Sequence, residues 1–379
     1  MPSNADRDLV LALNAANRLT RGALCRLATT TERWRNADRR DAGRLAAELG
    51  VPKLQLQRAL DLVPTASELS DAERARAAAA DSRLLTRFDD EYPRRLLDHP
   101  LPPAVLACRG RLEDGPAVAI VGSRRMDAYG YEAACLFAGG LARAGITVVS
   151  GFAVGVDQAA HRAALDAGGR TLAVLGCGID IDYPSGSRRL ASAIAERGAL
   201  LSELPFGTEP RAWHFPIRNR IIAALGAATL VVQAMPRSGS LITAHQALDL
   251  GRDVFAVPGR IVDALSAGTN ELLADGAFPA LAVDDLLDQL CAEWQLDLFP
   301  PPDRPTEPTP TSATSAAPRG PQPKGFAAQV VQHLPPGRVR TAEELAIELE
   351  SPVDRVLGAL LELELGGAIE RRPGPVYCR

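Results

Sequence analysis

The stretch Ala117-Val118-Ala119-Ile120-Val121, followed by Gly122-Ser123-Arg124-Arg125, decides the fold class. A short, wholly apolar run that ends in a glycine-serine turn predicts a strand buried on both faces. More runs of this kind follow before Leu290, and segments with helical apolar spacing separate them. Strands that alternate with helices predict an α/β fold with a parallel sheet. The further strands are expected at residues 146–150, 171–175, 199–202, 229–232 and 254–257.

Turns rich in glycine and serine follow most of these strands. The carboxyl ends of parallel strands meet at one edge of a sheet, where open α/β sheets bind ligands. Glycine lets the backbone approach a phosphate closely, and arginine side chains donate hydrogen bonds to its oxygens. The edge is therefore predicted to bind anions through the turns at residues 122–125, 151–155, 176–178, 203–207 and 237–240.

The hexapeptide Phe215-Pro216-Ile217-Arg218-Asn219-Arg220 runs into the apolar stretch 221–225. This pattern predicts a buried helix that begins near Arg218. A helix start there would add free backbone N–H groups and a positive dipole end to two guanidinium groups. Alternatively, the arginines are ordinary surface charges or pair with Glu203 and Glu209.

Phe215 presents an aromatic face on which a base could stack, worth roughly 1 to 3 kcal/mol in single-strand binders. Core packing is an equal alternative for this ring. One anion-binding turn would suffice for a mononucleotide phosphate, whereas several along one edge suit a chain of phosphates. The sequence therefore predicts a site for a chain of phosphates, with candidate residues Gly122, Ser123, Arg124, Phe215, Arg218, Asn219, Arg220, Gly239, Ser240 and Thr243.

Two common nucleotide motifs are missing from the sequence. No G-x-x-x-x-G-K phosphate loop occurs, and the turn after Val121 lacks the later glycines of G-x-G-x-x-G, so no cofactor is expected. Asp157 and His161 lie four residues apart and could form a base and its orienter or part of a metal site. We favour hydrogen bonding that shapes the loop, because no third ligand is identifiable. Glu203 is either an active-site carboxylate or the partner of an arginine, and no catalytic residue or metal ligand is assigned.

Length and charge set the remaining bounds. The chain has 379 residues, enough for two or three domains, and a net charge of -4, so nucleic-acid binding must come from a local patch. Six cysteines show no C-x-x-C spacing, which favours a reduced, cytoplasmic setting. The start of the chain lacks the features of a signal peptide, and no apolar run is long enough to cross a bilayer, so no membrane association is expected.

The segments that flank the sheet are predicted to be separate modules. Residues 1–84 show short helical patterns, and Gly22 could mark a DNA-binding helix-hairpin-helix turn, although a packing module of SAM type is favoured. An irregular connector is expected from Phe88 to Gly110. The core, with its lead-in, is placed at residues 85–298.

The end of the chain changes in composition. Residues 299–324 are rich in Pro, Thr, Ser and Ala and predict a disordered linker. A capping box at Thr341, a Ser351-Pro352 helix start and a glycine turn at 366–367 predict a winged helix within residues 325–379. Its second helix carries three acidic residues against a single arginine, which favours a protein-binding or vestigial module over a DNA reader.

Seven motifs together resemble the DNA-processing protein A (DprA or Smf) family of bacterial competence and recombination proteins. They occur in one order over about residues 85 to 290, and the flanking modules match only loosely. Tyr92-Pro93 and Pro102-Pro103 resemble the lead-in of the family. The motifs are Gly122-Ser123-Arg124, Ser150 to Asp157 with Ala160-His161, Leu175 to Asp180 with Tyr183-Pro184, Ser202-Glu203, Phe215 to Ile222, Ser238 to Ala244, and Val257-Pro258-Gly259.

The resemblance implies an extended Rossmann-like core that binds single-stranded DNA in a positive pocket, forms a homodimer and loads the RecA recombinase. It assigns Ser123, Arg124, Phe215, Arg218 to Arg220, Gly239 and Ser240 to that pocket. Two departures matter. Gln233 stands where the family commonly has Glu, and the lysines that often flank the pocket are absent, so Arg211 or Arg237 would have to substitute.

Two other classes of function stay open. A nucleotide-processing enzyme on a related core, such as a nucleoside-monophosphate phosphoribohydrolase, would use Glu203 or Asp157, but residues 236–240 supply its P-G-G-x-G-T loop poorly. The chain could also be chiefly an adaptor whose flanking modules perform the recognition.

Overall fold

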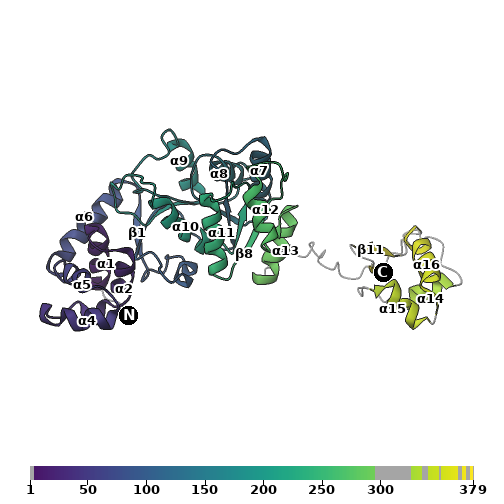
Figure 1. Cartoon of the computed structure of the whole chain (residues 1–379), viewed down its shortest axis with the longest axis horizontal. Coiled ribbons are helices and arrows are strands. Elements are labelled where there is room, and N and C mark those ends of the chain that lie inside the picture. Colours follow the sequence, from purple (N-terminus) through teal and green to yellow (C-terminus); the bar gives the residue numbers. More distant parts are fainter. Residues whose placement is uncertain are drawn as a thin grey trace, which may run out of the picture. The chain divides into compact units, whose positions relative to one another are not determined.

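The structure, a computed structural model, describes residues 4–294, 326–334, 340–349, 351–365, 369–372 and 376–378. The chain divides into two compact units, Met1–Pro300 and Pro301–Arg379 (Figure 1). The linker predicted at residues 299–324 lies outside the described residues.

A mixed sheet organises the first unit. Its strand order is β1-β2-β6-β5-β4-β3-β7-β8-β9, and neighbouring strands from β6 to β9 in this order pair in parallel. Each predicted strand is confirmed to within one residue at either end. The strands are β1 (Arg83–Thr86), β2 (Val105–Gly110), β3 (Ala117–Val121), β4 (Thr147–Ser150), β5 (Thr171–Val174), β6 (Ala199–Ser202), β7 (Ala228–Val231), β8 (Asp253–Ala256) and β9 (Phe278–Pro279).

The prediction of an irregular connector up to Gly110 is wrong for its last part, residues 105–110. β2 is a regular strand that pairs antiparallel with both β1 and β6, and its first four residues are buried. The antiparallel pairing explains the error. An antiparallel strand needs no helical crossover, so the helix that precedes or follows a parallel strand in the sequence pattern is missing here. The sheet is therefore parallel at its centre and antiparallel at one edge.

Helices cover both faces of the sheet. The helices α7 to α9 and α13 pack on one face, where Ile120, Val148 and Leu200 point. The helices α10 to α12 pack on the other face, over Ala119, Val149 and neighbouring residues. Their bounds are α7 (Ala128–Arg143), α8 (Val156–Asp166), α9 (Arg188–Arg197), α10 (His214–Leu225), α11 (Gly239–Asp249), α12 (Ala267–Ala274) and α13 (Val283–Trp294).

The connections reverse direction between β3 and β7. These strands are neighbours, yet α7 leaves β3 towards one face of the sheet and α11 leaves β7 towards the other. The carboxyl ends of two such strands separate into a crevice, which is where open α/β sheets bind ligands. The turns that follow Val121 and Val231 therefore border the position expected of a ligand site.

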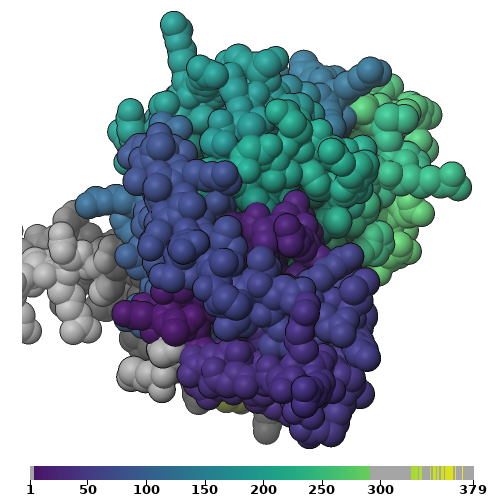
Figure 2. Space-filling model, turned by 90° about the vertical axis from the view of Figure 1, so that its left-hand side faces the viewer, coloured from purple at the N-terminus to yellow at the C-terminus, as the bar shows by residue number. Residues whose placement is uncertain are grey.

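The N-terminal segment is helical, as predicted. Its helices enclose a small core around the fully buried Trp34, and Leu27 and Leu56 pack in the same cluster. Figure 2 shows this segment lying directly against the core of the first unit. Gly22 is part of α2 and not of a turn. The elements are α1 (Asn4–Ala16), α2 (Arg21–Thr29), α3 (Thr31–Trp34), η1 (Arg39–Asp41), α4 (Ala42–Leu49), α5 (Lys53–Leu60), η2 (Val63–Thr65) and α6 (Ala66–Ala79), and η3 (Arg94–Asp98) follows β1.

The second unit has the elements of a winged helix. Three helices share a core that includes Val330, Leu345 and Leu360, and a three-stranded antiparallel sheet has the order β10-β12-β11. Both predicted helix starts are confirmed, while the expected turn at 366–367 lies outside the described residues. The elements are α14 (Phe326–Gln332), β10 (Arg340–Thr341), α15 (Ala342–Glu348), α16 (Val353–Leu365), β11 (Glu370–Arg372) and β12 (Val376–Cys378).

Candidate nucleic-acid interface

A cavity of about 430 Å³ opens at the crevice between β3 and β7. The turn after β3, the start of α10 and the start of α11 form its walls, so segments more than 100 residues apart meet there. Nine of the ten candidate residues line this cavity: Gly122, Ser123, Arg124, Phe215, Arg218, Asn219, Gly239, Ser240 and Thr243.

The charge of the cavity wall is positive. It carries the guanidinium groups of Arg124, Arg125 and Arg218 against the single carboxyl group of Asp157. Arg124 and Arg125 are exposed, whereas Arg218 is only 6% exposed. A chain of net negative charge thus carries a local excess of arginine at this cavity.

Phe215 is half-buried in this wall and surrounded by cationic and aromatic groups. The guanidinium carbons of Arg124 and Arg218 lie 5.0 and 5.9 Å from the centroid of its ring, within the range of cation–π attraction. The ring of Tyr183 packs against it at 5.6 Å between centroids. Gly176 is required behind the ring, since a Cβ atom there would lie 2.7 Å from Phe215 Cδ1. The ring is thus fixed in place while it lines the cavity.

Arg218 is held beneath the cavity by backbone carbonyl groups. Its Nη1 donates to the carbonyl oxygens of Gly151 and Val174, at the carboxyl ends of β4 and β5. Gly151 makes this approach possible, because a Cβ atom there would lie 2.4 Å from Nη1. Burial lowers the pKa of Arg218 to about 10, so the group remains charged at neutral pH. Its buried Nε has no hydrogen-bond partner among the described residues.

The start of α11 forms the opposite wall. The Ser238 side chain caps this helix by accepting from the Ser240 backbone N–H at 3.3 Å. Asn219 Nδ2 donates to the carbonyl oxygen of Gly239 at 3.0 Å, so α10 positions the start of α11. A helix start that faces arginine side chains suits a phosphate group. Asn219 therefore both lines the cavity and positions the start of α11.

The prediction that Arg220 joins this cavity is wrong. Arg220 is 7% exposed and is not among the lining residues. Its Nη2 donates to Glu203 Oε1, and its Nε donates to the carbonyl oxygen of Leu101 at 3.2 Å. Arg218 and Arg220 are two positions apart, so they point to different sides of the helix. The alternative that Glu203 pairs with one of these arginines is confirmed.

The predicted start of the helix is also wrong. α10 begins at His214, so Arg218 lies in its second turn and its backbone N–H group is not an unpaired terminal donor. Pro216 does not stop the helix, because a proline in the first turn removes an N–H group that has no partner in the helix. The contribution of α10 to the cavity is therefore made by side chains.

Asp157 hydrogen-bonds to the loop at residue 153, whereas His161 hydrogen-bonds to Thr171 on β5. Asp157 Oδ2 accepts from the Ala153 N–H at 3.2 Å, and burial raises the pKa of its carboxyl group. His161 Nδ1 contacts Thr171 Oγ1 at 2.6 Å, and burial lowers the pKa of its imidazole to about 3. Within the described part of the chain, no group of three or more His, Cys, Asp or Glu residues could hold a metal ion.

Sequence reasoning missed two residues at or beside the cavity. Met235 lines it and is 52% exposed, while Arg125 lines it as part of the predicted turn at 122–125. Trp213 precedes α10 and is 57% exposed, with the guanidinium carbon of Arg211 at 5.2 Å from the centroid of its ring. The sequence signal that could have identified Trp213 is the arginine two residues before it, just ahead of the Phe215 motif.

Comparison with known proteins identifies the family of this chain. A family model described as DNA recombination-mediator protein A matches residues 83–291, and one described as DprA winged helix domain matches residues 301–375. The protein Smf of Synechocystis is 36% identical over 320 residues, which cover 78% of this chain and 80% of that protein. The chain belongs to the DNA recombination-mediator protein A family. The resemblance drawn from the sequence motifs is thereby confirmed.

Other relatives in this DprA/Smf family carry DNA-processing names. The DNA processing protein DprA of Streptococcus pneumoniae is 43% identical over 202 residues, covering 53% of this chain and 71% of that protein. The X-ray structure of DprA from the same species has a TM-score of 0.65 and 33% identity, covering 76% of this chain and 99% of that chain. These matches identify the family and confirm the Rossmann-like core.

A second solved structure concerns a ligand. DNA processing protein A from Helicobacter pylori, whose structure describes a single-stranded DNA binding mode of that protein, has a TM-score of 0.51 and 30% identity. It covers 56% of this chain and 98% of that chain.

Within the described residues of the present chain, no helix is long and apolar enough to span a membrane.

Proposed function

We propose that this protein binds single-stranded DNA in the cavity between β3 and β7. The convergence of Arg124, Arg218 and Phe215 with the start of α11 in one cavity carries the proposal. The guanidinium groups and the helix start bind phosphates, and the Phe215 ring stacks a base. The Helicobacter pylori relative supports this reading because its structure concerns a single-stranded DNA binding mode.

The shape of the cavity favours the single strand over the duplex. Phe215 lies in the wall of a hollow at the edge of the sheet, so only an unpaired base can reach its ring. In a duplex the bases are stacked and paired, and their faces are covered. Duplex DNA would contact only the exposed arginines at the rim, such as Arg124 and Arg125.

We propose that the function is binding and not catalysis. Glu203, the carboxylate favoured for the enzymatic alternative, is paired with Arg220 and does not line the cavity. Asp157 lines it, but its carboxyl group accepts from the Ala153 backbone and shapes the loop. An assay for release of a base from nucleoside monophosphates tests this point. Turnover by the wild type that Asp157→Ala abolishes would favour the phosphoribohydrolase reading.

We further propose that the protein protects single strands and loads the RecA recombinase onto them in the cytoplasm. This step rests on the resemblance to the family and on the recombination-mediator description of the matching model. Stopped-flow measurement of RecA filament growth on strands coated with a single-strand binding protein tests it. Acceleration by the wild type and none by Arg124→Ala is the expected result.

We propose a homodimer formed through the Rossmann-like core. The edge strand β9 leaves Phe278 44% exposed, and Leu281 just beyond it is 70% exposed. Exposed apolar side chains at a sheet edge suit pairing with a second copy. The mass in solution by light scattering should be that of a dimer, and Leu281→Asp should give a monomer. We also propose that the domains of the chain meet near residues 84, 298 and 324.

Fluorescence anisotropy with labelled single- and double-stranded oligonucleotides tests the central proposal. The wild type should prefer the single strand, and its affinity should fall as salt is raised. Arg124→Ala should weaken binding and reduce the salt slope by about 0.7, the value for one phosphate of a single strand. Arg44→Ala on α4 is the matched control, because this exposed arginine pairs with Glu48 in the N-terminal segment. Equal affinity of Arg124→Ala and wild type would overturn the proposal.

A further inference from the structure

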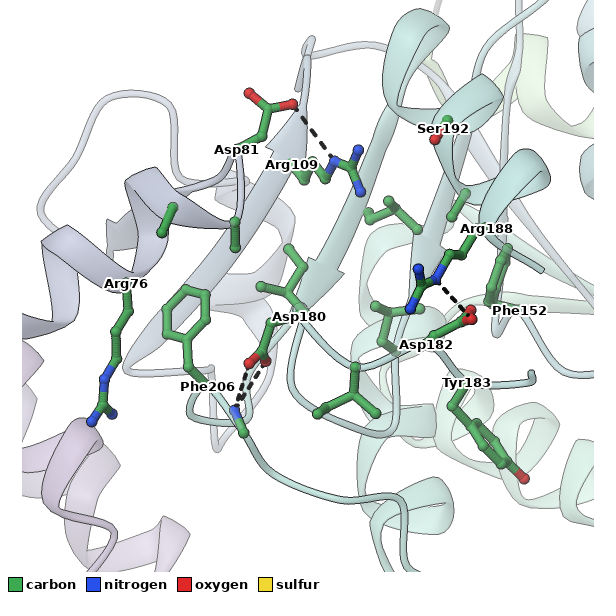
Figure 3. A pocket seen from close by; sticks show the side chains of 18 residues that line it. Arg76, Asp81, Arg109, Phe152, Asp180, Asp182, Tyr183, Arg188, Ser192 and Phe206 are labelled. Carbon is green, nitrogen blue, oxygen red and sulfur yellow. Dashed lines mark hydrogen bonds and ion pairs between the residues drawn. The ribbon is translucent and has the colours of Figure 1, made fainter. Parts of the chain in front are cut away.

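A second hollow, of about 820 Å³, lies between α6 and α9 across the antiparallel edge of the sheet. Figure 3 shows its charged side chains: Arg76 and Arg188 lie on opposite sides, with Arg109 and Phe206 between them. The floor is apolar and includes Leu175 and Leu200. Nothing described so far uses this hollow, which we call the edge groove.

The edge groove adjoins the cavity between β3 and β7. Tyr183 lines the groove, and its ring packs at 5.6 Å between centroids against Phe215, which lines the cavity. Phe152 lines the groove, and the next residue, Ala153, lines the cavity. The two hollows therefore meet at the contact between the Phe215 and Tyr183 rings.

Arg109 is suited to receive a phosphate in the groove. It belongs to β2, its side chain is 31% exposed, and its buried Nε, which has no hydrogen bond among the described residues, is the atom that faces Asp81. Its ion pair with Asp81 is long, at 3.7 Å, and the Asp81 side chain is 92% exposed. Such an exposed, distant pair contributes little, so an incoming phosphate can displace it.

The negative charge of the groove is balanced, because three guanidinium groups line it together with three carboxylates: Arg76, Arg109, Arg188, Asp81, Asp180 and Asp182. Asp180 accepts from the Gly207 backbone N–H at 3.0 Å, and Asp182 pairs with Arg188 at 2.9 Å. Arg188 is 83% exposed and can turn to a phosphate while it stays near Asp182. Phe206 is half-buried and offers a second ring to a base.

We propose that the edge groove is a second nucleotide-binding segment, which receives the single strand as it leaves the cavity over the Phe215–Tyr183 pair. Arg109 and Arg188 bind phosphates, and Tyr183 and Phe206 contact bases. The inference rests on the proposed function, since a strand must first occupy the cavity. It assigns to the junction of α6 with the core a part in determining the length of DNA bound.

Anisotropy of the full chain with labelled oligothymidylates of graded length, from about 4 to about 30 nucleotides, tests this inference. Arg109→Ala should weaken binding of the long strands about fivefold near ~0.1 M salt, the effect of one lost phosphate contact, and leave the shortest strands unaffected. Asp81→Asn is the opposing control: it removes the competing carboxylate from Arg109, so binding of the long strands should strengthen. A long strand with a terminal 5-iododeoxyuridine should cross-link to Tyr183 or Phe206.

The outcomes separate the two proposals. Absence of single-strand binding at every length would overturn the proposed function. If short strands bind but length adds no affinity, or if Arg109→Ala and Asp81→Asn both match the wild type on long strands, the edge groove is not a nucleotide site. Cross-links confined to Phe215 and its neighbours in the cavity would overturn it as well.

Discussion

Arg220 on α10 donates to Glu203 at 2.5 Å, and both side chains are less than 10% exposed. The same carboxylate accepts from Arg21 on α2, in the N-terminal segment. α10 also carries Phe215 and Arg218 on its other side. One helix thus connects the N-terminal segment to the candidate DNA site, and a carboxylate first considered for catalysis forms this connection.

Glu203→Gln is expected to lower the free energy of unfolding by about 3 kcal/mol, because it leaves the buried Arg220 without a counter-charge. Urea denaturation measures this change. Arg21→Ala should cost less than about 1 kcal/mol, since Arg21 is 30% exposed and its partner keeps Arg220. A Glu203→Gln variant as stable as the wild type would show that the pair is not structural.

Gly176→Ala is expected to displace the Phe215 ring, since the new methyl group would lie 2.7 Å from Phe215 Cδ1. Affinity for single-stranded DNA should fall about fivefold or more, the lower bound for losing one stacked base. Anisotropy gives the affinity, and circular dichroism checks that the fold is retained. Gly43→Ala on α4 is the control, where a Cβ atom would meet nothing closer than 3.9 Å. Equal losses in the two variants would contradict the proposed role of Phe215.

The sequence predicted the centre of the sheet well, because buried parallel strands are continuous apolar runs with clear turns. It failed at β2, whose antiparallel pairing with β6 involves residues about 90 positions apart. The residues of β2 and their neighbours in sequence contain no signal for a pairing partner so far along the chain. The N-terminal and winged-helix segments were predicted as to class from short amphipathic helices and caps.

The candidate site could be predicted in composition but not in orientation. Helical spacing places Arg218 and Arg220 on different sides of α10, but it does not show which side faces the cavity. Burial does not distinguish them either, since both side chains are buried. The deciding contact is Glu203, which follows a different strand, β6. The edge groove was not predicted at all, since Arg109 and Tyr183 belong to segments that only the tertiary fold brings together.

His161 is expected to make stability depend on pH. Burial lowers the pKa of this imidazole to about 3 in the folded protein, against about 6.5 when unfolded. Below pH 6.5 the unfolded chain therefore binds a proton that the folded protein does not, and stability falls by roughly 1.4 kcal/mol per pH unit down to about pH 3. In urea denaturation at pH 7.5, 6 and 5, His161→Gln should show a flatter dependence than the wild type.

The control for this pH dependence is His245→Gln. His245 is exposed on α11, so its replacement should leave the pH dependence of the wild type unchanged. If His161→Gln retains the full slope between pH 6 and pH 5, another group causes the loss of stability in acid.

Gln233→Glu is expected to destabilise this chain, although the resemblance drawn from the sequence motifs implies Glu at this position. The Gln233 side chain is fully buried and donates from Nε2 to Asp127 Oδ1 at 2.8 Å, while its Oε1 accepts from the Asp127 N–H. Asp127 also caps α7 by accepting from the Gly130 N–H at 2.9 Å, and these hydrogen bonds lower its pKa. A glutamate in place of Gln233 would set a second carboxylate against this one.

Two carboxyl groups at such a distance cannot both ionise without cost, so one pKa of the pair rises in the folded protein. A raised carboxyl pKa stabilises the fold at low pH, and that stability is lost as pH rises through the folded-state value. Gln233→Glu should therefore match the wild type near pH 4, below the pKa of about 4.3 for Glu in an unfolded chain, and be less stable by about 1 to 2 kcal/mol at pH 8. The double variant Asp127→Asn with Gln233→Glu restores one donor and one acceptor, and should regain most of the loss. If the single variant is equally stable at both pH values, Asp127 does not sense the charge at position 233.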